Sequence, residues 1–158
     1  MVTMLRAVRF LSVLVVGLGL VALLGYLGLM RTTRDWFDTD LTLRSRLAVE
    51  SARGSLATSW ASDPRRLHET LEDIARDERI MAAAACSTQG RALAATTYYP
   101  ASFDCAPLLE RMRREASDAT PAWSTTAELP SGRVHLSLTR LEANGAELGV
   151  VVLVHDLS

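Results

Sequence analysis

Residues 10 to 30 form an uncharged apolar run of 21 residues, FLSVLVVGLGLVALLGYLGLM. At about 1.5 Å of rise per helical residue, such a run reaches across the roughly 30 Å hydrocarbon core of a bilayer. The core of a cleaved secretory signal spans about 7–15 residues and ends at an A-x-A-like site; this run is longer and ends without one. The run favours an uncleaved anchor over a cleaved signal and predicts a cytoplasmic N-terminus over 1–9 and a transmembrane helix over 10–30.

The residues that flank this run do not determine its orientation in the membrane. Trp36 and Phe37 suit the aromatic belt at a membrane interface, although packing at a helix start explains the pair equally well. Arginines are fewer before the run than after it, so a count of positive residues favours a cytoplasmic C-terminal side. The charge pattern therefore leaves the topology open.

The two cysteines favour the opposite orientation. Cys86 and Cys105 enclose a short loop in a small domain, and such a pair predicts a disulfide only in an oxidising compartment. Closing a loop of about 20 residues stabilises a fold by about 3 kcal/mol in the chain-entropy model. We therefore predict a single-pass membrane protein with its N-terminus inside and its domain outside the cytoplasm. Two unrelated buried thiols are the alternative.

Composition and motifs argue against catalysis by this chain. The net charge of −1 gives no indication of a nucleic-acid partner. The sequence contains no P-loop, no G-x-S-x-G elbow and no H-E-x-x-H. His68, His135 and His155 lack the spacing of metal ligands. We predict no catalytic residue, no metal and no cofactor.

The residues after the apolar run divide into a stalk and a domain. Apolar residues recur at helical spacing up to Ser62, which predicts a juxtamembrane stalk helix over 31–62 that continues the membrane helix. The domain then covers 63–158. Its first helix begins at Asp63-Pro64, an N-cap followed by proline at the first helical position, and ends near Asp77.

The rest of the domain alternates strands with one helix. Segments 79–88 and 91–97 flank Gln89-Gly90, and a further helix begins near Ala106-Pro107. Three strands follow, at 123–129, 133–141 and 146–155. Asn144-Gly145 between the last two is a strong hairpin signal, because both central positions of a type I′ turn need positive φ. The last strand is apolar on both faces, which predicts a central place in the sheet.

This order of elements, over residues 35–156, resembles the PAS-like or Cache-like extracytoplasmic sensor domains of bacterial membrane receptors. The resemblance implies an α+β fold: a transmembrane helix extending into a stalk helix, then a five-stranded antiparallel sheet with helices on one side. In such domains a ligand pocket lies between the sheet and the segment that covers it, here 98–109. The candidate pocket residues are Tyr98, Tyr99, Phe103, Trp123, His135 and Arg140. The alternative is that these aromatic residues fill the core.

Several short segments carry a closer resemblance: Trp36-Phe37, DLTLRS at 40–45, DERI at 77–80, CSTQGR at 86–91, CAPL at 105–108, Leu148-Gly149 and VHDLS at 154–158. They look like the membrane-anchored sensory region ahead of some proteobacterial trehalose-6-phosphate synthases. There, a second transmembrane helix, a HAMP-type linker and the glycosyltransferase follow. The resemblance implies that this chain is the sensory head alone, with no counterpart of the catalytic positions.

Three functional hypotheses follow from these patterns. The first is a membrane-anchored sensory or regulatory module that binds an unidentified small molecule and signals through its membrane helix to a cytoplasmic output. The second is the N-terminal fragment of a membrane-bound, UDP-forming trehalose-6-phosphate synthase. The third is a membrane-tethered partner-binding domain. The lipid bilayer is the expected partner, together with a second copy of the chain through Leu41 and Ala48 of the stalk helix.

Overall fold

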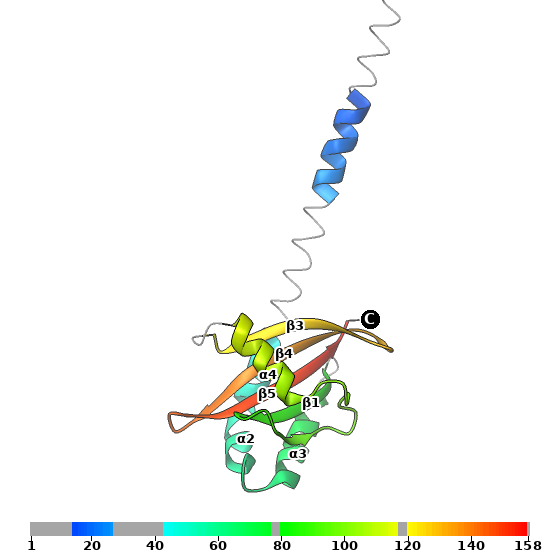
Figure 1. The fold of residues 1–158 in the computed structure, drawn as a ribbon. Helices are drawn as coiled ribbons and strands as arrows, with labels where there is room; N and C mark the ends of the chain where they lie inside the picture. The colour runs from blue at the N-terminus through cyan, green and yellow to red at the C-terminus, as the bar shows by residue number, and fades with distance from the viewer. Residues whose placement is uncertain (1–13, 27–42, 77–79, 117–119, 158) are drawn as a thin grey trace, which may run out of the picture. The chain divides into compact units, whose positions relative to one another are not determined.

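The computed structural model describes residues 14–26, 43–76, 80–116 and 120–157 (Figure 1). The chain divides into two compact units, residues 1–39 and 40–158. The second unit contains all the strands of the described residues. The predicted interface residues Trp36 and Phe37 and the stalk residue Leu41 lie outside the described residues.

The second unit is built around one antiparallel sheet of five strands in the order β2-β1-β5-β4-β3 (Figure 1). The strand bounds are β1 Ile80–Ser87, β2 Ala92–Ala95, β3 Ala122–Leu129, β4 Gly132–Ala143 and β5 Ala146–Asp156. β5 is central, as its apolar sequence predicted. Asn144 and Gly145 have φ of 53° and 76°, which confirms the tight β4–β5 turn.

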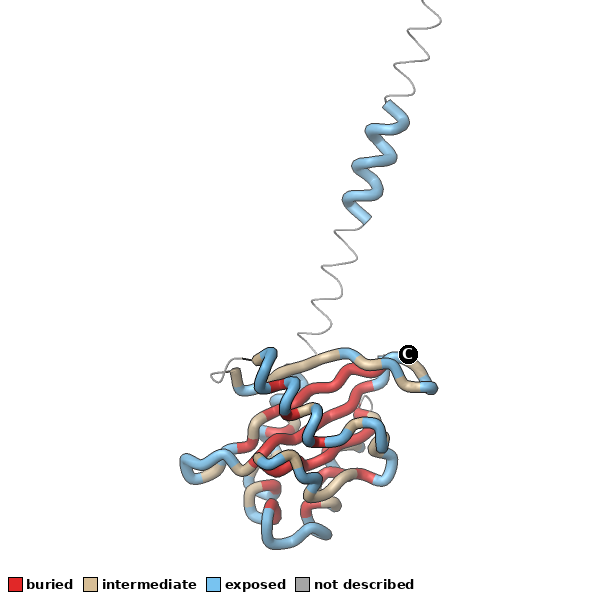
Figure 2. Tube along the Cα trace, in the orientation of Figure 1, coloured by how far each residue is buried: buried red, intermediate tan, exposed pale blue. Residues whose placement is uncertain are grey.

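The helices cover both faces of this sheet. On one face, α2 (Arg53–Ser59) and α3 (Pro64–Ala75) form a core with Ala83 and Ala85 of β1 and with Val151 and Leu153 of β5. On the other, α4 (Cys105–Glu115) packs with the alternate residues of the same strands. Figure 1 shows α4 crossing the sheet, and Figure 2 shows the buried residues concentrated in the central strands.

The prediction of helices on one side of the sheet is therefore wrong. β1 and β5 carry apolar side chains on both faces, and each face loses contact with water only when a helix covers it. We call the two sides the α2–α3 face and the α4 face.

The helices predicted to begin at Asp63-Pro64 and near Ala106-Pro107 are confirmed, with small differences at their ends. Of the predicted stalk helix 31–62, residues 31–42 lie outside the described residues. Residues 43–51 are helical, and the hydrogen bonds from Ala52 N to Ala48 O and from Leu56 N to Ala52 O continue this helix into α2. Asp63 caps α3 by accepting a hydrogen bond from the backbone N of Arg66 at 3.0 Å. α3 ends at Ala75, two residues before the predicted end.

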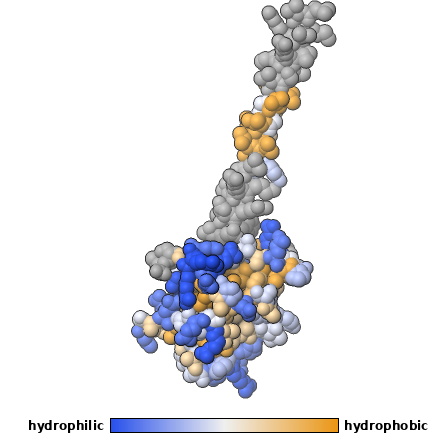
Figure 3. Space-filling view, viewed as in Figure 1, coloured by the Kyte–Doolittle hydropathy of each residue, from blue (hydrophilic) through white to orange (hydrophobic). Residues whose placement is uncertain are grey.

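The first unit contains a helical stretch at residues 14–26. Its side chains are exposed and mostly hydrophobic (Figure 3). No helix of the described residues is long and apolar enough to cross a membrane. The remaining residues of the predicted 10–30 span lie outside the described ranges.

Strand β2 is shorter than the predicted 91–97: Thr96 still bonds to Ala83 of β1, whereas Thr97 bonds to a helix. A carboxylate oxygen of Glu72, on α3, accepts hydrogen bonds from Thr97 N at 2.7 Å and from Thr97 Oγ1 at 2.9 Å. One turn earlier on α3, His68 Nδ1 lies 2.7 Å from the carbonyl oxygen of Ala95. These contacts attach α3 to the end of β2.

We predict that Glu72→Gln weakens the fold at neutral pH. The backbone hydrogen bond from Thr97, followed by that from its hydroxyl, lowers the pKa of Glu72 below its ordinary value of 4.5. A carboxyl group whose pKa is lower in the folded than in the unfolded state stabilises the fold at pH values above its unfolded-state pKa. This stabilisation is lost as the pH falls through the folded-state pKa. The difference in unfolding midpoint between wild type and variant should narrow below pH 4.5.

Glu69→Gln is the matched control, because Glu69 pairs with the exposed Arg65 on the same helix. Thermal unfolding of all three proteins between pH 3 and pH 7 tests this account. A constant difference between wild type and Glu72→Gln across this range would contradict it.

We also predict that Gly149→Ala destabilises the fold by about 2 kcal/mol or more. Gly149 has φ of 155°, and an added Cβ would overlap the carbonyl oxygen of Cys86 and lie 2.8 Å from the ring of Trp60. Gly54→Ala is the control, since an added Cβ there meets open space and removing a helical glycine stabilises by about 0.4–1 kcal/mol. Urea unfolding measures both changes, and equal effects would contradict the steric explanation.

Candidate ligand site

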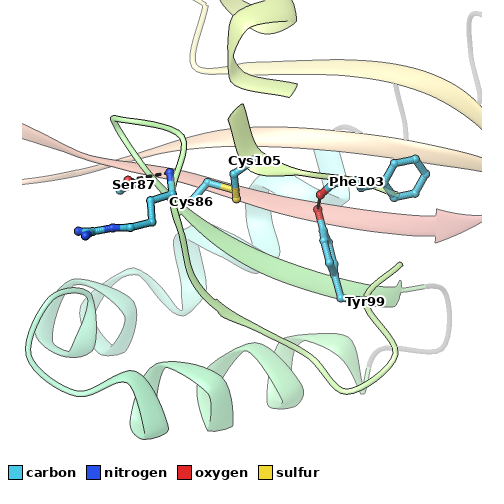
Figure 4. Close-up of a disulfide and its surroundings, with 6 residues drawn as sticks. Cys86, Ser87, Tyr99, Phe103 and Cys105 are labelled. Carbon is cyan, nitrogen blue, oxygen red and sulfur yellow. Dashed lines mark hydrogen bonds between the residues drawn. A yellow bond between two sulfur atoms is a disulfide. The ribbon is translucent and has the colours of Figure 1, made fainter. Parts of the chain in front are cut away.

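A disulfide joins the sheet to its cover on the α4 face. Cys86, near the end of β1, is bonded to Cys105, the first residue of α4, with their Cα atoms 5.6 Å apart (Figure 4). Both residues are buried. The predicted pairing is confirmed, and it fixes the start of α4 against the central part of the sheet.

The segment before α4 is held in place by its own hydrogen bonds. The hydroxyl of Tyr99 donates to the carbonyl oxygen of Phe103 at 2.9 Å (Figure 4). Burial raises the pKa of the Tyr99 phenol far above its ordinary value, and the negative charge of Asp104 adds to the effect. Tyr99 therefore stays a neutral donor. Backbone bonds from Tyr99 N to Thr96 O and from Phe103 N to Pro100 O complete two turns.

A cavity of about 650 Å³ opens beside this segment, within the volume range of small-molecule sites. It lies between the first strand, the segment 98–102 and the β3–β4 turn. Its walls combine apolar side chains with three hydroxyl groups, and among the described residues none that lines it is charged. The lining residues are Met81, Tyr98, Pro100, Ser102, Leu129, Pro130 and Ser131. We call it the turn cavity.

The structure does not bring the six predicted pocket residues together. Of the six, Tyr98 lines the turn cavity, with 80% of its surface exposed. Tyr99, Phe103 and Trp123 pack against the core of the α4 face, as the alternative reading expected. The guanidinium of Arg111 lies 5.5 Å from the centre of the Trp123 ring.

His135 and Arg140 are placed elsewhere. His135 belongs to the residues of β4 that alternate away from Val134, Leu136 and Leu138 of the α4 face, so it lies on the α2–α3 face. It is buried, and its ring centre is 6.0 Å from that of His155. Arg140 Nη1 lies 3.6 Å from a carboxylate oxygen of Glu147. Neither His135 nor Arg140 lines the turn cavity.

The sequence patterns missed most of the turn cavity. Its residues in β1 and at the end of β3 come together because strand pairing aligns the start of β1 with the end of β5, and the end of β5 with the start of β4. The β3–β4 turn lies beside them because it leads into the start of β4. Pro130 and Ser131 lie between the predicted strands 123–129 and 133–141, but their position beside segment 98–102 depends on the strand order of the whole sheet.

The described residues contain no group of three His, Cys, Asp or Glu side chains arranged to hold a metal ion. The site therefore has to be understood from its hydroxyl groups and apolar walls.

Several solved structures are similar to this chain in fold. No protein-family model matches this chain, and neither does any curated protein. The ligand-binding domain of the Pseudomonas fluorescens chemoreceptor CtaA in complex with L-serine is similar over 84% of this chain and 59% of its own, with a TM-score of 0.55 and 22% identity. The same domain in complex with L-isoleucine is similar over 80% of this chain and 53% of its own, with a TM-score of 0.52 and 19% identity.

The periplasmic domain of Vibrio cholerae LuxQ also matches, over 73% of this chain and 58% of its own, with a TM-score of 0.49 and 19% identity. This chain thus spans between half and two thirds of each of these domains. The likeness to CtaA is one of fold, and the strand order confirms the predicted α+β class with a five-stranded antiparallel sheet for the second unit.

Proposed function

We propose that residues 40–158 form an extracytoplasmic sensory module that binds a small molecule in the turn cavity. The observation that carries this proposal is a cavity of about 650 Å³ beside a cover segment that ends at the disulfide. The likeness to the CtaA ligand-binding domain supports it as a likeness of fold. The module has no catalytic role in this proposal.

The walls of the turn cavity indicate the class of ligand. Because its hydroxyl groups come from Tyr98, Ser102 and Ser131 and no charged side chain lines it among the described residues, a charged ligand would lose hydration without gaining an ion pair. The cavity therefore suits an uncharged molecule with an apolar body and a hydrogen-bonding group. L-Serine and L-isoleucine, seen in CtaA, suit it less well.

We predict that cyclohexanol raises the thermal unfolding midpoint of the full chain in detergent more than L-isoleucine does. Replacing both Ser102 and Ser131 with alanine should weaken cyclohexanol binding several-fold, because a neutral hydrogen bond contributes about 0.5–1.5 kcal/mol. Ser62→Ala is the matched control, since Ser62 bonds to Thr58 O away from the cavity. Equal affinity in the double variant and the control would remove the turn cavity as the site.

We further propose that residues 10–30 anchor the chain in the inner membrane, with residues 1–9 in the cytoplasm, Trp36 and Phe37 at the interface and the domain in the periplasm. The uncharged run and the disulfide support this arrangement. The excess of arginines after the run opposes it, so the orientation needs a direct measurement.

The redox state of the two cysteines in cells tests the orientation. After the cells are acid-quenched and the protein is denatured, which exposes both buried residues, we expect a maleimide to label Cys86 and Cys105 only after treatment with a reductant, because a periplasmic domain keeps its disulfide. Cys86→Ser is the control, since it leaves Cys105 as a lone thiol for labelling without reduction. Labelling of the wild type without a reductant would contradict the periplasmic orientation.

A signal would leave the domain through the helical segment 43–51. Ser45 on this segment makes a 2.7 Å hydrogen bond with Nε2 of His155 on β5. The signal passes only if this segment has two positions and the ligand binds the domain with a different affinity in each of them. Pairing with a second copy would use Leu43 and Leu47, which are 54% and 60% exposed, whereas Ala48 packs against the core.

The trehalose-6-phosphate synthase relationship and the partner-binding role stay predictions from the sequence. A reading frame that continues beyond Ser158 into an apolar run and a glycosyltransferase would support the first. Without a transferase, the sensory and partner-binding proposals remain, and the cyclohexanol measurement distinguishes them.

A further inference from the structure

A second cavity, of about 420 Å³, lies on the α2–α3 face, away from the turn cavity. The helical segment 43–51 and the start of α2 form one wall, and β4 with Pro121 forms the other. This cavity, which we call the basic groove, shares no residue with the turn cavity.

One arginine of the groove is left for an anion with a single negative charge. Three arginines and two glutamates line the groove, but Arg53 pairs with Glu50, and Arg140 pairs with Glu147, which does not line it. Arg46 is exposed and makes no ion pair within the described part of the chain. Arg53 Nη1 bonds to Glu50 at 3.0 Å, while its Nε is buried and has no partner among the described residues.

An unused hydroxyl group on the sheet side adds a second, independent indication. Thr139 lines the groove, is only 4% exposed, and lies on the α2–α3 face because it alternates with Leu136 and Leu138 of the opposite face. Its Oγ1 has no hydrogen-bond partner among the described residues. Buried polar groups are normally paired, so an unpaired donor beside arginines indicates a missing acceptor.

The groove also has an apolar part. Leu43 and Leu47 contribute exposed side chains from the helical segment, and Pro121 faces them from the start of β3. A ligand here needs an apolar body joined to a singly charged acceptor. Inorganic phosphate lacks the apolar body, and its second charge would meet Glu50 and Glu142.

We propose that the basic groove binds a small organic carboxylate, with Arg46 and Arg53 pairing with the carboxylate and the Thr139 hydroxyl donating to it. The apolar body of the ligand lies against Leu43 and Leu47. This site is independent of the turn cavity. Because its two walls are the helical segment and β4, an occupied groove holds the segment on the sheet.

Benzoate is the probe, and benzamide is its uncharged match in shape. Equilibrium dialysis of the full chain in detergent micelles, against protein-free micelles, measures both affinities. We expect benzoate to bind at least tenfold more tightly than benzamide. Arg46→Gln should reduce benzoate affinity about tenfold, in line with a hydrogen bond between charged groups, and leave cyclohexanol binding unchanged. Arg65→Gln, an exposed arginine on α3, should bind benzoate as the wild type does.

The Thr139→Val variant distinguishes a loss of ligand binding from a loss of folding stability. This variant should lose benzoate affinity several-fold without a lower unfolding midpoint, because Oγ1 makes no hydrogen bond to any of the described residues. The proposal is overturned by equal binding of benzoate and benzamide, by equal benzoate affinity in Arg46→Gln and Arg65→Gln, or by tighter binding of inorganic phosphate than of benzoate.

Discussion

The burial of β5 on both faces determines the arrangement of the rest of the domain. Residues 150–154 of this strand are completely buried, with Val151 and Leu153 in one core and the alternate valines in the other. An apolar strand in the middle of a sheet gains its stability only when both faces are removed from water. The helices around α2 and α3 cover one face, and α4, held by the Cys86–Cys105 disulfide, covers the other.

The α2–α3 face has a polar part and an apolar part. Ser45 meets a buried polar group that includes His135, Ser137 and His155, whereas Val49 and Leu56 lie in the apolar core. Apolar contacts are non-directional, but a buried polar contact depends on the geometry of each hydrogen bond. The start of the helical segment is therefore held by contacts that a small shift breaks, and its later turns by contacts that tolerate one. This difference gives the signal-transmission proposal its physical basis.

Most of the sheet could be predicted from the sequence, but the placement of the cover could not. Asn144-Gly145 and the strand alternation define β4 and β5, because turn chemistry and side-chain period are local properties. The alanines at 82–85 show no such period, because all four are apolar and they lie alternately in the two cores. The sequence therefore does not reveal that a helix covers each face. The alternation within 133–141 separates His135 from Leu136, but it does not tell which helix covers each face, so the predicted pocket included a residue of the α2–α3 face.

The two proposed sites are connected through β4. The turn cavity adjoins the turn that begins this strand, and the basic groove adjoins residues 139–142 near its end, on the opposite face. Ligands in the two sites do not meet, so any effect of one on the other has to pass through the sheet or the helical segment. Such an effect is reciprocal in free energy. Because the cores on both sides of β4 and β5 are closely packed and buried, the sheet resists deformation, and the helical segment, held at its start by Ser45, is the element through which coupling would act.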